Sequence, residues 1–209
     1  MTLLFYICLL GFISTIPPYY LSLEHLKLEK KYGKEKGKTI GKISGAISGW
    51  AFFLFWFGIW LSPQPRFTIP FLQDLLFRIL VIDLTIPLLH LLIFVPFFML
   101  GAWFGIKGVV ETTLEVAETH RPTRVVTTGV YSIVRHPQYL GGLLAHVAFT
   151  FIFSALYSLL ITPLIAGIVY LLSRKEEEEL TKEFGEEYIR YKKKVPMFLP
   201  KLKAPRASN

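Results

Sequence analysis

The sequence contains very little cysteine and none of several familiar catalytic or nucleotide-binding patterns. Cys8 is its only cysteine, so the chain has no intrachain disulfide and no cysteine cluster for a metal ion. A Gly-x-Gly-x-x-Gly pattern after a strand, a phosphate-binding loop and a Gly-x-Ser-x-Gly elbow are all missing. These absences exclude a Rossmann-type nucleotide domain and the usual serine hydrolase arrangement. No internal repeat is evident, which argues against many secondary transporters.

Long apolar runs dominate the chain. Hydrophobic residues make up 53% of its 209 residues, too many for an ordinary soluble domain. Several runs reach the ~20 residues that a helix needs to cross a bilayer. The first run lacks a preceding basic segment, so we expect a retained span and not a cleaved signal peptide. We predict an all-α polytopic membrane protein of about five transmembrane helices, at residues 3–21, 43–61 and 79–106 and two within 139–173, with a turn near 154–158.

The pattern predicts a single integral membrane domain over residues 1–209. Residues 1–106 would hold the N-terminal spans. Residues 107–209 would hold a polar loop up to residue 138, the last two spans as a helical hairpin, and a C-terminal helix. Residues 69–78 mix polar and apolar side chains and fit either an interfacial helix or the start of the third span. After residue 174 we expect one amphipathic helix with an apolar face formed by Leu180, Phe184, Tyr188 and Tyr191.

The net charge of +8 is concentrated beside the apolar runs. Seven lysines lie between Lys27 and Lys42, and a second basic cluster runs from Arg190 to Arg206. Basic flanks of membrane spans indicate the cytoplasmic side and attract anionic lipid heads. We therefore predict that both clusters and the loop at 107–138 face the cytoplasm, and we predict no nucleic acid partner.

Chemically useful side chains gather around the helical hairpin. Pro137 fits the first turn of a helix, which would hold Arg135 and His136 at the membrane surface. If the hairpin closes, Glu176 and Glu177 return close to His136. Each group also has a structural interpretation, since arginine can reach lipid phosphates and acidic runs are usually solvated. Tyr131 and Tyr139 likewise fit an interfacial aromatic belt.

Three ionisable residues fall inside predicted spans, namely Asp83, His90 and His146. Intramembrane ionisable groups are costly and often functional. They would form a polar path in a channel, transporter or scaffold, or they would pair with one another. Histidine and carboxylate also suit zinc or iron, but the sequence has no compact motif such as His-Glu-x-x-His. We therefore predict no metal site.

A multi-part motif resembles a known family. Gly129-x-Tyr131-x3-Arg135-His136-Pro137-x-Tyr139-x-Gly141 precedes the hairpin, and Glu176-Glu177-x2-Leu180-x3-Phe184-Gly185-x2-Tyr188-x2-Tyr191 follows it. This pattern, over residues 124–200, resembles the isoprenylcysteine carboxyl methyltransferase family and the wider group of phospholipid methyltransferase-like membrane enzymes. Thr123 and Leu172 stand where relatives often carry histidine and arginine, so the methyl acceptor stays open.

The resemblance implies methyl transfer from S-adenosylmethionine to a lipophilic acceptor at the cytoplasmic face. It implies Glu176, Arg135 and His136 as catalytic residues. A cation such as Arg135 suits the methionine carboxylate of the cofactor, carboxylates suit its amino and ribose groups, and aromatic faces suit its sulfonium. The implied cofactor-binding residues are Val125, Val126, Gly129, Tyr131, Arg135, His136, Pro137, Tyr139, Glu176 and Glu177.

Several acceptors and rival functions remain compatible with the sequence. The resemblance favours carboxyl O-methylation of a prenylated cysteine, which needs no base. A lipid head-group amine is the alternative, and it would need Glu176 or His136 to remove a proton. Sterol reductases look similar in this region, so an NADPH-dependent membrane reductase is a further rival. A membrane channel or scaffold is the non-enzymatic one.

Overall fold

The computed structural model describes residues 2–71, 74–80, 84–119 and 122–200. Asp83 lies outside these residues, and so does the tail after Pro200. The N-terminal half contains α1 (Leu3–Ser14), α2 (Ile16–Leu23), α3 (His25–Tyr32), α4 (Lys34–Leu61), and strands β1 (Leu76–Ile79) and β2 (Leu84–Pro87). The remainder contains α5 (Leu88–Thr112), α6 (Leu114–Thr119), the 3-10 turn η1 (Gly129–Ser132), α7 (Pro137–Ile152), α8 (Leu156–Phe184) and α9 (Glu186–Lys194).

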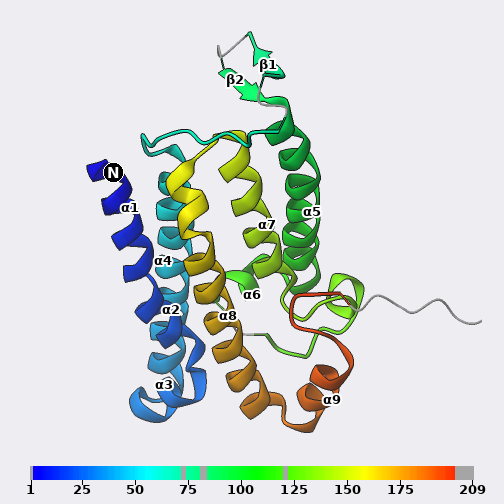
Figure 1. Cartoon of the computed structure of the whole chain (residues 1–209). Helices are drawn as coiled ribbons and strands as arrows, with labels where there is room; N and C mark the ends of the chain where they lie inside the picture. Colours follow the sequence, from blue (N-terminus) through cyan, green and yellow to red (C-terminus); the bar gives the residue numbers. More distant parts are fainter. Residues whose placement is uncertain (1, 72–73, 81–83, 120–121, 201–209) are drawn as a thin grey trace, which may run out of the picture.

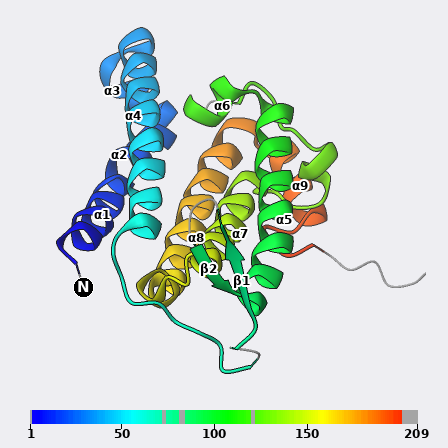
Figure 2. The ribbon, with the colours of Figure 1, turned by 90° about the horizontal axis from the view of Figure 1, so that it is seen from above.

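The long helices run side by side as a bundle, with the small β-hairpin at one end (Figure 1). Helices α3 and α9 lie toward the other end, and Figure 2 shows α4 and α5 on opposite sides of α7 and α8. Four stretches of the described chain are long and apolar enough to span a membrane: Leu3–Leu23, Lys34–Leu61, Leu88–Thr112 and Leu156–Phe184. The predicted all-α membrane fold is therefore confirmed.

Helix α7 takes the place of the predicted fourth span. Its 16 residues make it about 24 Å long, shorter than the ~30 Å of a typical hydrocarbon core. The predicted turn of the hairpin is confirmed, because α7 ends at Ile152 and α8 begins at Leu156. Length alone thus supports four full spans, and α7 is the fifth helix of the bundle.

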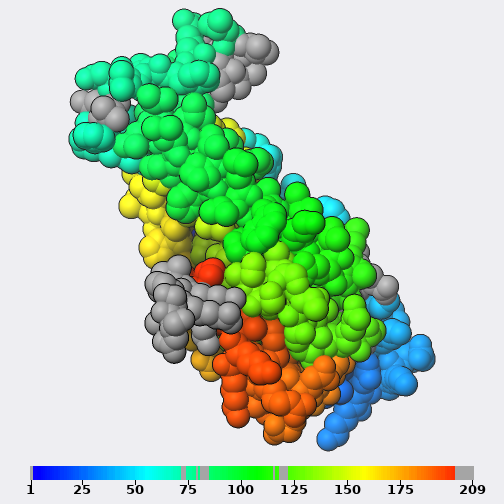
Figure 3. All heavy atoms as spheres, turned by 90° about the vertical axis from the view of Figure 1, so that its right-hand side faces the viewer, coloured from blue at the N-terminus to red at the C-terminus, as the bar shows by residue number. Residues whose placement is uncertain are grey.

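The predicted third span begins later than expected. Residues 76–79 and 84–87 form an antiparallel hairpin, and the helix starts only at Leu88. Pro87 provides the reason, because proline lacks an N–H and favours an extended residue before it. Ile86 is accordingly in a strand. The described residues between 69 and 78 form no helix, so neither interpretation of this segment is correct. Helix α5 runs on to Thr112, beyond the predicted end at residue 106. Figure 3 shows the hairpin protruding beyond the bundle.

The predicted C-terminal amphipathic helix is two helices. Helix α8 continues unbroken from the membrane span to Phe184, and Gly185 then adopts a positive φ of 52°. Glycine is the residue that takes this conformation without strain. The chain therefore turns, and α9 carries Tyr188 and Tyr191 back to the bundle, where both side chains are buried.

Glycines set the closest helix contact of the bundle, between α5 and α7. A Cβ atom added to Gly141 would lie 2.6 Å from the backbone nitrogen of Gly105 and 2.7 Å from the backbone oxygen of Gly101. Small residues let membrane helices approach in this way. Because the obstructing atoms are backbone atoms, the helices themselves would have to move to accept a side chain.

We therefore expect Gly141→Ala to destabilise the protein by about 1–3 kcal/mol, since the added methyl overpacks a helix contact. Thermal unfolding of the purified protein in detergent checks this. The matched control is Gly167→Ala on α8, where an added Cβ has nothing within 4 Å. Equal unfolding midpoints for both variants would contradict the proposed contact.

Candidate functional site

Three segments distant in sequence meet beside the start of α7. Pro137 begins α7, as predicted, and His136 precedes it in a non-helical conformation. The residues after α9 run back over this point, because the backbone nitrogen of Arg135 donates to the Pro196 carbonyl at 2.9 Å. The nitrogen of His136 donates to the Met197 carbonyl at 3.3 Å. The end of α8 supplies the third segment, with Glu176 and Glu177.

Glu177 is the centre of the polar contacts and is almost fully buried, with 1% exposure. Its Oε1 accepts from Arg135 Nε at 2.7 Å and lies 3.2 Å from His136 Nε2. Its Oε2 lies 2.9 Å from Lys192 Nζ of α9. A buried carboxylate is tolerable only when it is paired and hydrogen-bonded in this way. The predicted approach of Glu177 to the Arg135–His136 pair is thus present.

Arg135 also binds the C-terminal segment. Its Nη1 donates to the carbonyl of Lys192 at 3.1 Å and to the carbonyl of Val195. A single guanidinium therefore connects the loop before α7 with α8, with α9 and with Val195 directly after α9. These contacts compete with the expected direct binding of a cofactor carboxylate by Arg135.

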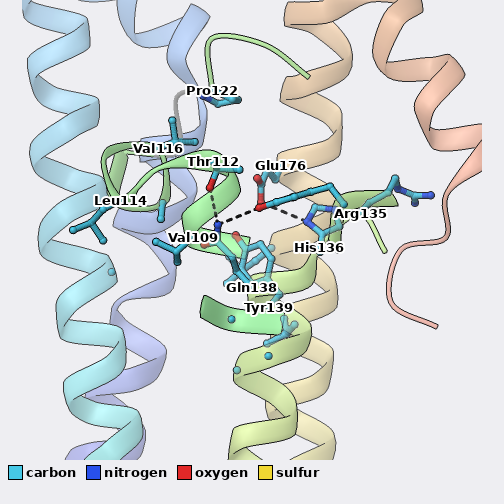
Figure 4. A pocket seen from close by; sticks show the side chains of 18 of the residues that line it. Val109, Thr112, Leu114, Val116, Pro122, Arg135, His136, Gln138, Tyr139 and Glu176 are labelled. Atoms are coloured by element: carbon cyan, nitrogen blue, oxygen red, sulfur yellow. Dashed lines mark hydrogen bonds and ion pairs between the residues drawn. The ribbon is translucent and has the colours of Figure 1, made fainter. Parts of the chain in front are cut away.

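Glu176 faces the other way. Its Oε2 is 3.7 Å from His136 Nδ1 and has no hydrogen-bond partner among the described residues, although the atom is buried. Buried polar atoms are usually hydrogen-bonded, so this oxygen is free to accept a hydrogen bond from a group bound in the same space. Figure 4 shows Glu176, His136 and Gln138 around one space between the helices.

Tyrosines surround the same space. The hydroxyls of Tyr19 and Tyr139 are 2.8 Å apart, which brings α2 into the site. Tyr131 accepts at its hydroxyl from Gln138 Nε2 at 3.1 Å, and Tyr191 donates to its carbonyl at 2.7 Å. Burial, with a contribution from the charge of Glu176, raises the pKa of Tyr131 to about 12. This phenol therefore stays protonated at physiological pH.

Gly129 packs against a carboxylate that the sequence had not indicated. It has a positive φ of 52°, and an added Cβ would lie 1.8 Å from Glu111 Oε1. The same oxygen accepts from the backbone nitrogen of Val130 at 3.1 Å. Gly129 thus shapes the loop before α7 and lets Glu111 hold it, in agreement with the predicted turn.

A cavity of about 630 Å³ lies between α4, α5, α7 and α8, and residues of α6 and of the loop that follows it also line it. Cavities of this size hold small molecules. Most of its wall is apolar, including Phe52, Trp56, Phe98 and Ile106. Seven of the predicted site residues line the cavity, namely Val125, Val126, Tyr131, Arg135, His136, Tyr139 and Glu176. The other three, Gly129, Pro137 and Glu177, do not line it.

Several lining residues were missed from the sequence. Tyr19 comes from the second N-terminal helix, and Thr112 and Gln138 are joined by a hydrogen bond of 3.0 Å. Arg124 also lines the cavity and is exposed. The position of Gln138 between Pro137 and Tyr139 was an available signal. No local signal marks Tyr19, because its contact spans 120 positions of sequence.

The intramembrane histidines have structural partners. His146 accepts from the indoles of Trp56 and Trp60 at 2.9 Å each. The Nδ1 of His90 lies 2.9 Å from Ser154 Oγ. Neither histidine lines the cavity. Within the described ranges, no three histidine, cysteine, aspartate or glutamate side chains are grouped to hold a metal ion.

Replacing Glu177 by glutamine should destabilise the fold. The change removes the charge that Arg135, His136 and Lys192 share, and breaking a buried ion pair costs about 3–5 kcal/mol. Glu178→Gln is the matched control, because that neighbour is exposed. Thermal unfolding in detergent should separate the two variants clearly. A midpoint for Glu177→Gln within error of the control would mean that the buried ion pairs do not hold the site.

Comparison with known proteins identifies relatives of the part of the chain that contains these site residues. Residues 90–187 match the family model of phospholipid methyltransferases. The chain is 39% identical over 114 residues to the mouse protein-S-isoprenylcysteine O-methyltransferase, covering 50% of this chain and 36% of that protein. It is 38% identical over 98 residues to the human protein of that name, covering 43% and 31%. It is 33% identical over 110 residues to methanethiol S-methyltransferase of Pseudomonas deceptionensis, covering 48% and 37%.

The chain therefore spans roughly a third of the length of these curated relatives, 36% for the mouse protein. No solved structure matches it significantly. The region of similarity contains Arg135, His136, Glu176 and Glu177 and excludes α1 to α4. The resemblance to the isoprenylcysteine methyltransferases and phospholipid methyltransferase-like membrane enzymes, seen first in the motif, is confirmed for this part of the chain.

Proposed function

We propose that the chain is an S-adenosylmethionine-dependent membrane methyltransferase that acts on a lipophilic acceptor. One observation carries this proposal. Glu176 presents a buried oxygen without a hydrogen-bond partner in the described structure, and it does so in an apolar cavity between helices long enough to span a membrane. The family model of phospholipid methyltransferases matches residues 90–187, which include Glu176.

The residues of the cavity fit the proposed cofactor. S-adenosylmethionine supplies an electrophilic methyl group on a positively charged sulfur. A cation is stabilised by a carboxylate at low dielectric and by aromatic faces, and the cavity offers Glu176, Tyr131 and Tyr139. Arg124 is an exposed cation on the same wall and suits a carboxylate group of the cofactor. Val125 and Val126 add apolar surface for its remaining part.

The other predicted site residues would act by shaping this wall. Gly129 and Pro137 set the loop and the start of α7, while Glu177 holds Arg135 and His136 in place. His136 and Glu176 are the groups nearest to an acceptor proton if the acceptor carries one. Catalysis would depend mainly on positioning and exclusion of water, because the methyl donor is already reactive.

The cavity favours a large apolar acceptor. Its rim on α4 and α5 contains the exposed apolar side chains Trp50, Phe53, Ile106 and Val110. A lipid tail can lie against such a surface, whereas methanethiol would leave most of it uncovered. We therefore propose carboxyl O-methylation of an isoprenylcysteine-type acceptor, by analogy with the mammalian relatives. N-methylation of a lipid head-group amine is the alternative, for which Glu176 would accept the proton.

The proposed reaction is tested with purified protein in lipid bilayers and radiolabelled S-adenosylmethionine. We expect saturable cofactor binding and label on a prenylcysteine, released by alkali as an ester would be. Label stable to alkali on lipid heads would favour the amine alternative. Binding of NADPH alone would favour a reductase, and binding of neither would leave a channel or scaffold.

Glu176→Gln should slow the reaction more than it weakens cofactor binding. The reason is that Glu176 would face the positively charged sulfur of a cofactor bound in the cavity that it lines, and misplacing reacting groups costs about 100-fold in rate. Single-turnover rates and cofactor affinities for this variant and for exposed Glu178→Gln check it. Equal rates for the two variants would remove Glu176 from the catalytic residues.

We also propose that the site opens toward the cytoplasm. The lysine-rich α3 and the start of α4 lie at the same end of the molecule as α9. Positive charge marks the cytoplasmic side.

In a Cys8→Ala background, cysteines at Lys36 and Lys193 should resist an impermeant thiol reagent added to intact cells. Both positions are exposed, so protection would come from the membrane and not from burial. A cysteine at exposed Thr68 should react and serves as the positive control, because the segment after α4 that contains it runs along the opposite end of the bundle (Figure 1). Labelling at Lys36 or Lys193 would contradict this orientation.

A further inference from the structure

Small residues line the two facing walls of the cavity. Helix α4 contributes Gly45, Ala46 and Gly49, and α5 contributes Gly101, Ala102 and Gly105. Figure 2 shows these two helices on either side of the bundle, with α6 near both. Glycine costs a helix about 1 kcal/mol relative to alanine, so each glycine needs a structural reason.

Some of these glycines are explained by helix contacts. An added Cβ at Gly101 would lie 3.0 Å from backbone atoms of Gly141 and Ala145, so this glycine lets α7 approach. Gly141 is explained in the same way from the other side.

Gly49 and Gly105 are different. An added Cβ at either position has no heavy atom within 4 Å, yet both residues line the cavity. No helix contact at the missing Cβ explains them. A side chain at these positions would instead extend into or over the cavity.

The neighbours of these two glycines show what kind of group the space suits. Trp50 and Phe53 follow Gly49 on α4, and Ile106 and Val109 follow Gly105 on α5. The polar groups of the site, Glu176 and His136, come from α8 and the start of α7. The part of the cavity beside Gly49 and Gly105 is therefore walled by apolar side chains, and it suits an apolar ligand group.

We propose that Gly49 and Gly105 set the cross-section of the apolar group that the cavity accepts. Both positions would then determine specificity for acceptors with a bulky, branched hydrocarbon tail over those with a short chain. This inference rests on the proposed function for the identity of the acceptor. It assigns a role to α4, which lies outside the region of similarity to the methyltransferases.

The test measures binding separately from turnover. Protein in bilayer discs, saturated with S-adenosylhomocysteine, is titrated with radiolabelled S-farnesylcysteine and with S-butylcysteine. We expect Gly49→Leu and Gly105→Leu to weaken farnesylcysteine binding about tenfold or more, because added methylenes exclude a ligand by roughly that factor each. Binding of S-butylcysteine and of S-adenosylhomocysteine should change less than threefold. Alanine at the same positions should have an intermediate effect.

Gly167→Leu is the matched control. It lies on a long apolar helix, its missing Cβ also has nothing within 4 Å, and it does not line the cavity. Three outcomes would overturn the inference. The three leucine variants could lose binding equally, the two acceptors could lose binding equally, or the wild type could show no saturable farnesylcysteine binding. An unfolding midpoint equal to that of the wild type excludes misfolding of a variant. If a leucine variant fails to fold, the alanine variant at the same position tests the size limit in its place. Selective binding without methyl transfer by the wild type would overturn the proposed function and leave the size limit standing.

Discussion

The site depends on one buried carboxylate, Glu177. Its two oxygens contact Arg135 and His136 in the loop before α7 and Lys192 in α9. Without compensation, burying this charge would be prohibitive, so the three partners are needed together. Because Arg135 also binds the carbonyls of Lys192 and Val195, the arrangement joins the hairpin to the C-terminal segment. The buried charge of Glu177 thus stabilises the site from directly behind the side chains that line the cavity.

The four adjacent glutamates, 176–179, have different surroundings because successive residues of a helix point in different directions. Glu177 faces its three partners at the loop before α7 and in α9, whereas Glu176 lines the cavity. Glu179 pairs with Lys175 and Lys182, and it is not the solvated position that an acidic run suggests. Only Glu178 of the four is exposed. An apparently uniform acidic run therefore contains one cavity-lining group, two buried carboxylates that form ion pairs and one solvated side chain.

Helix positions and the hairpin were predictable because apolar length and proline placement are local signals. The motif also brought Arg135, His136, Glu176 and Glu177 together, since α7 and α8 must return to the same membrane face. The β-hairpin before Pro87 and the break at Gly185 were missed, because there a single residue's backbone preference overrides a periodic pattern. Tyr19 could not be predicted, because it meets Tyr139 only through the packing of the whole bundle.

The cavity is formed both by the part of the chain that matches the methyltransferase family model and by helices outside that part. The matched region ends at residue 187 and begins at His90, yet Tyr19, Gly49, Phe52 and Trp56 line the same cavity from α2 and α4. The groups for the proposed cofactor come from the matched half, where the chemistry constrains residue types. The apolar space is bounded by both parts of the chain, with Phe98 and Ile106 from the matched region and Phe52 and Trp56 from α4. Sequence similarity can therefore indicate the proposed reaction, while part of the wall that would contact the acceptor comes from α4, outside the matched region.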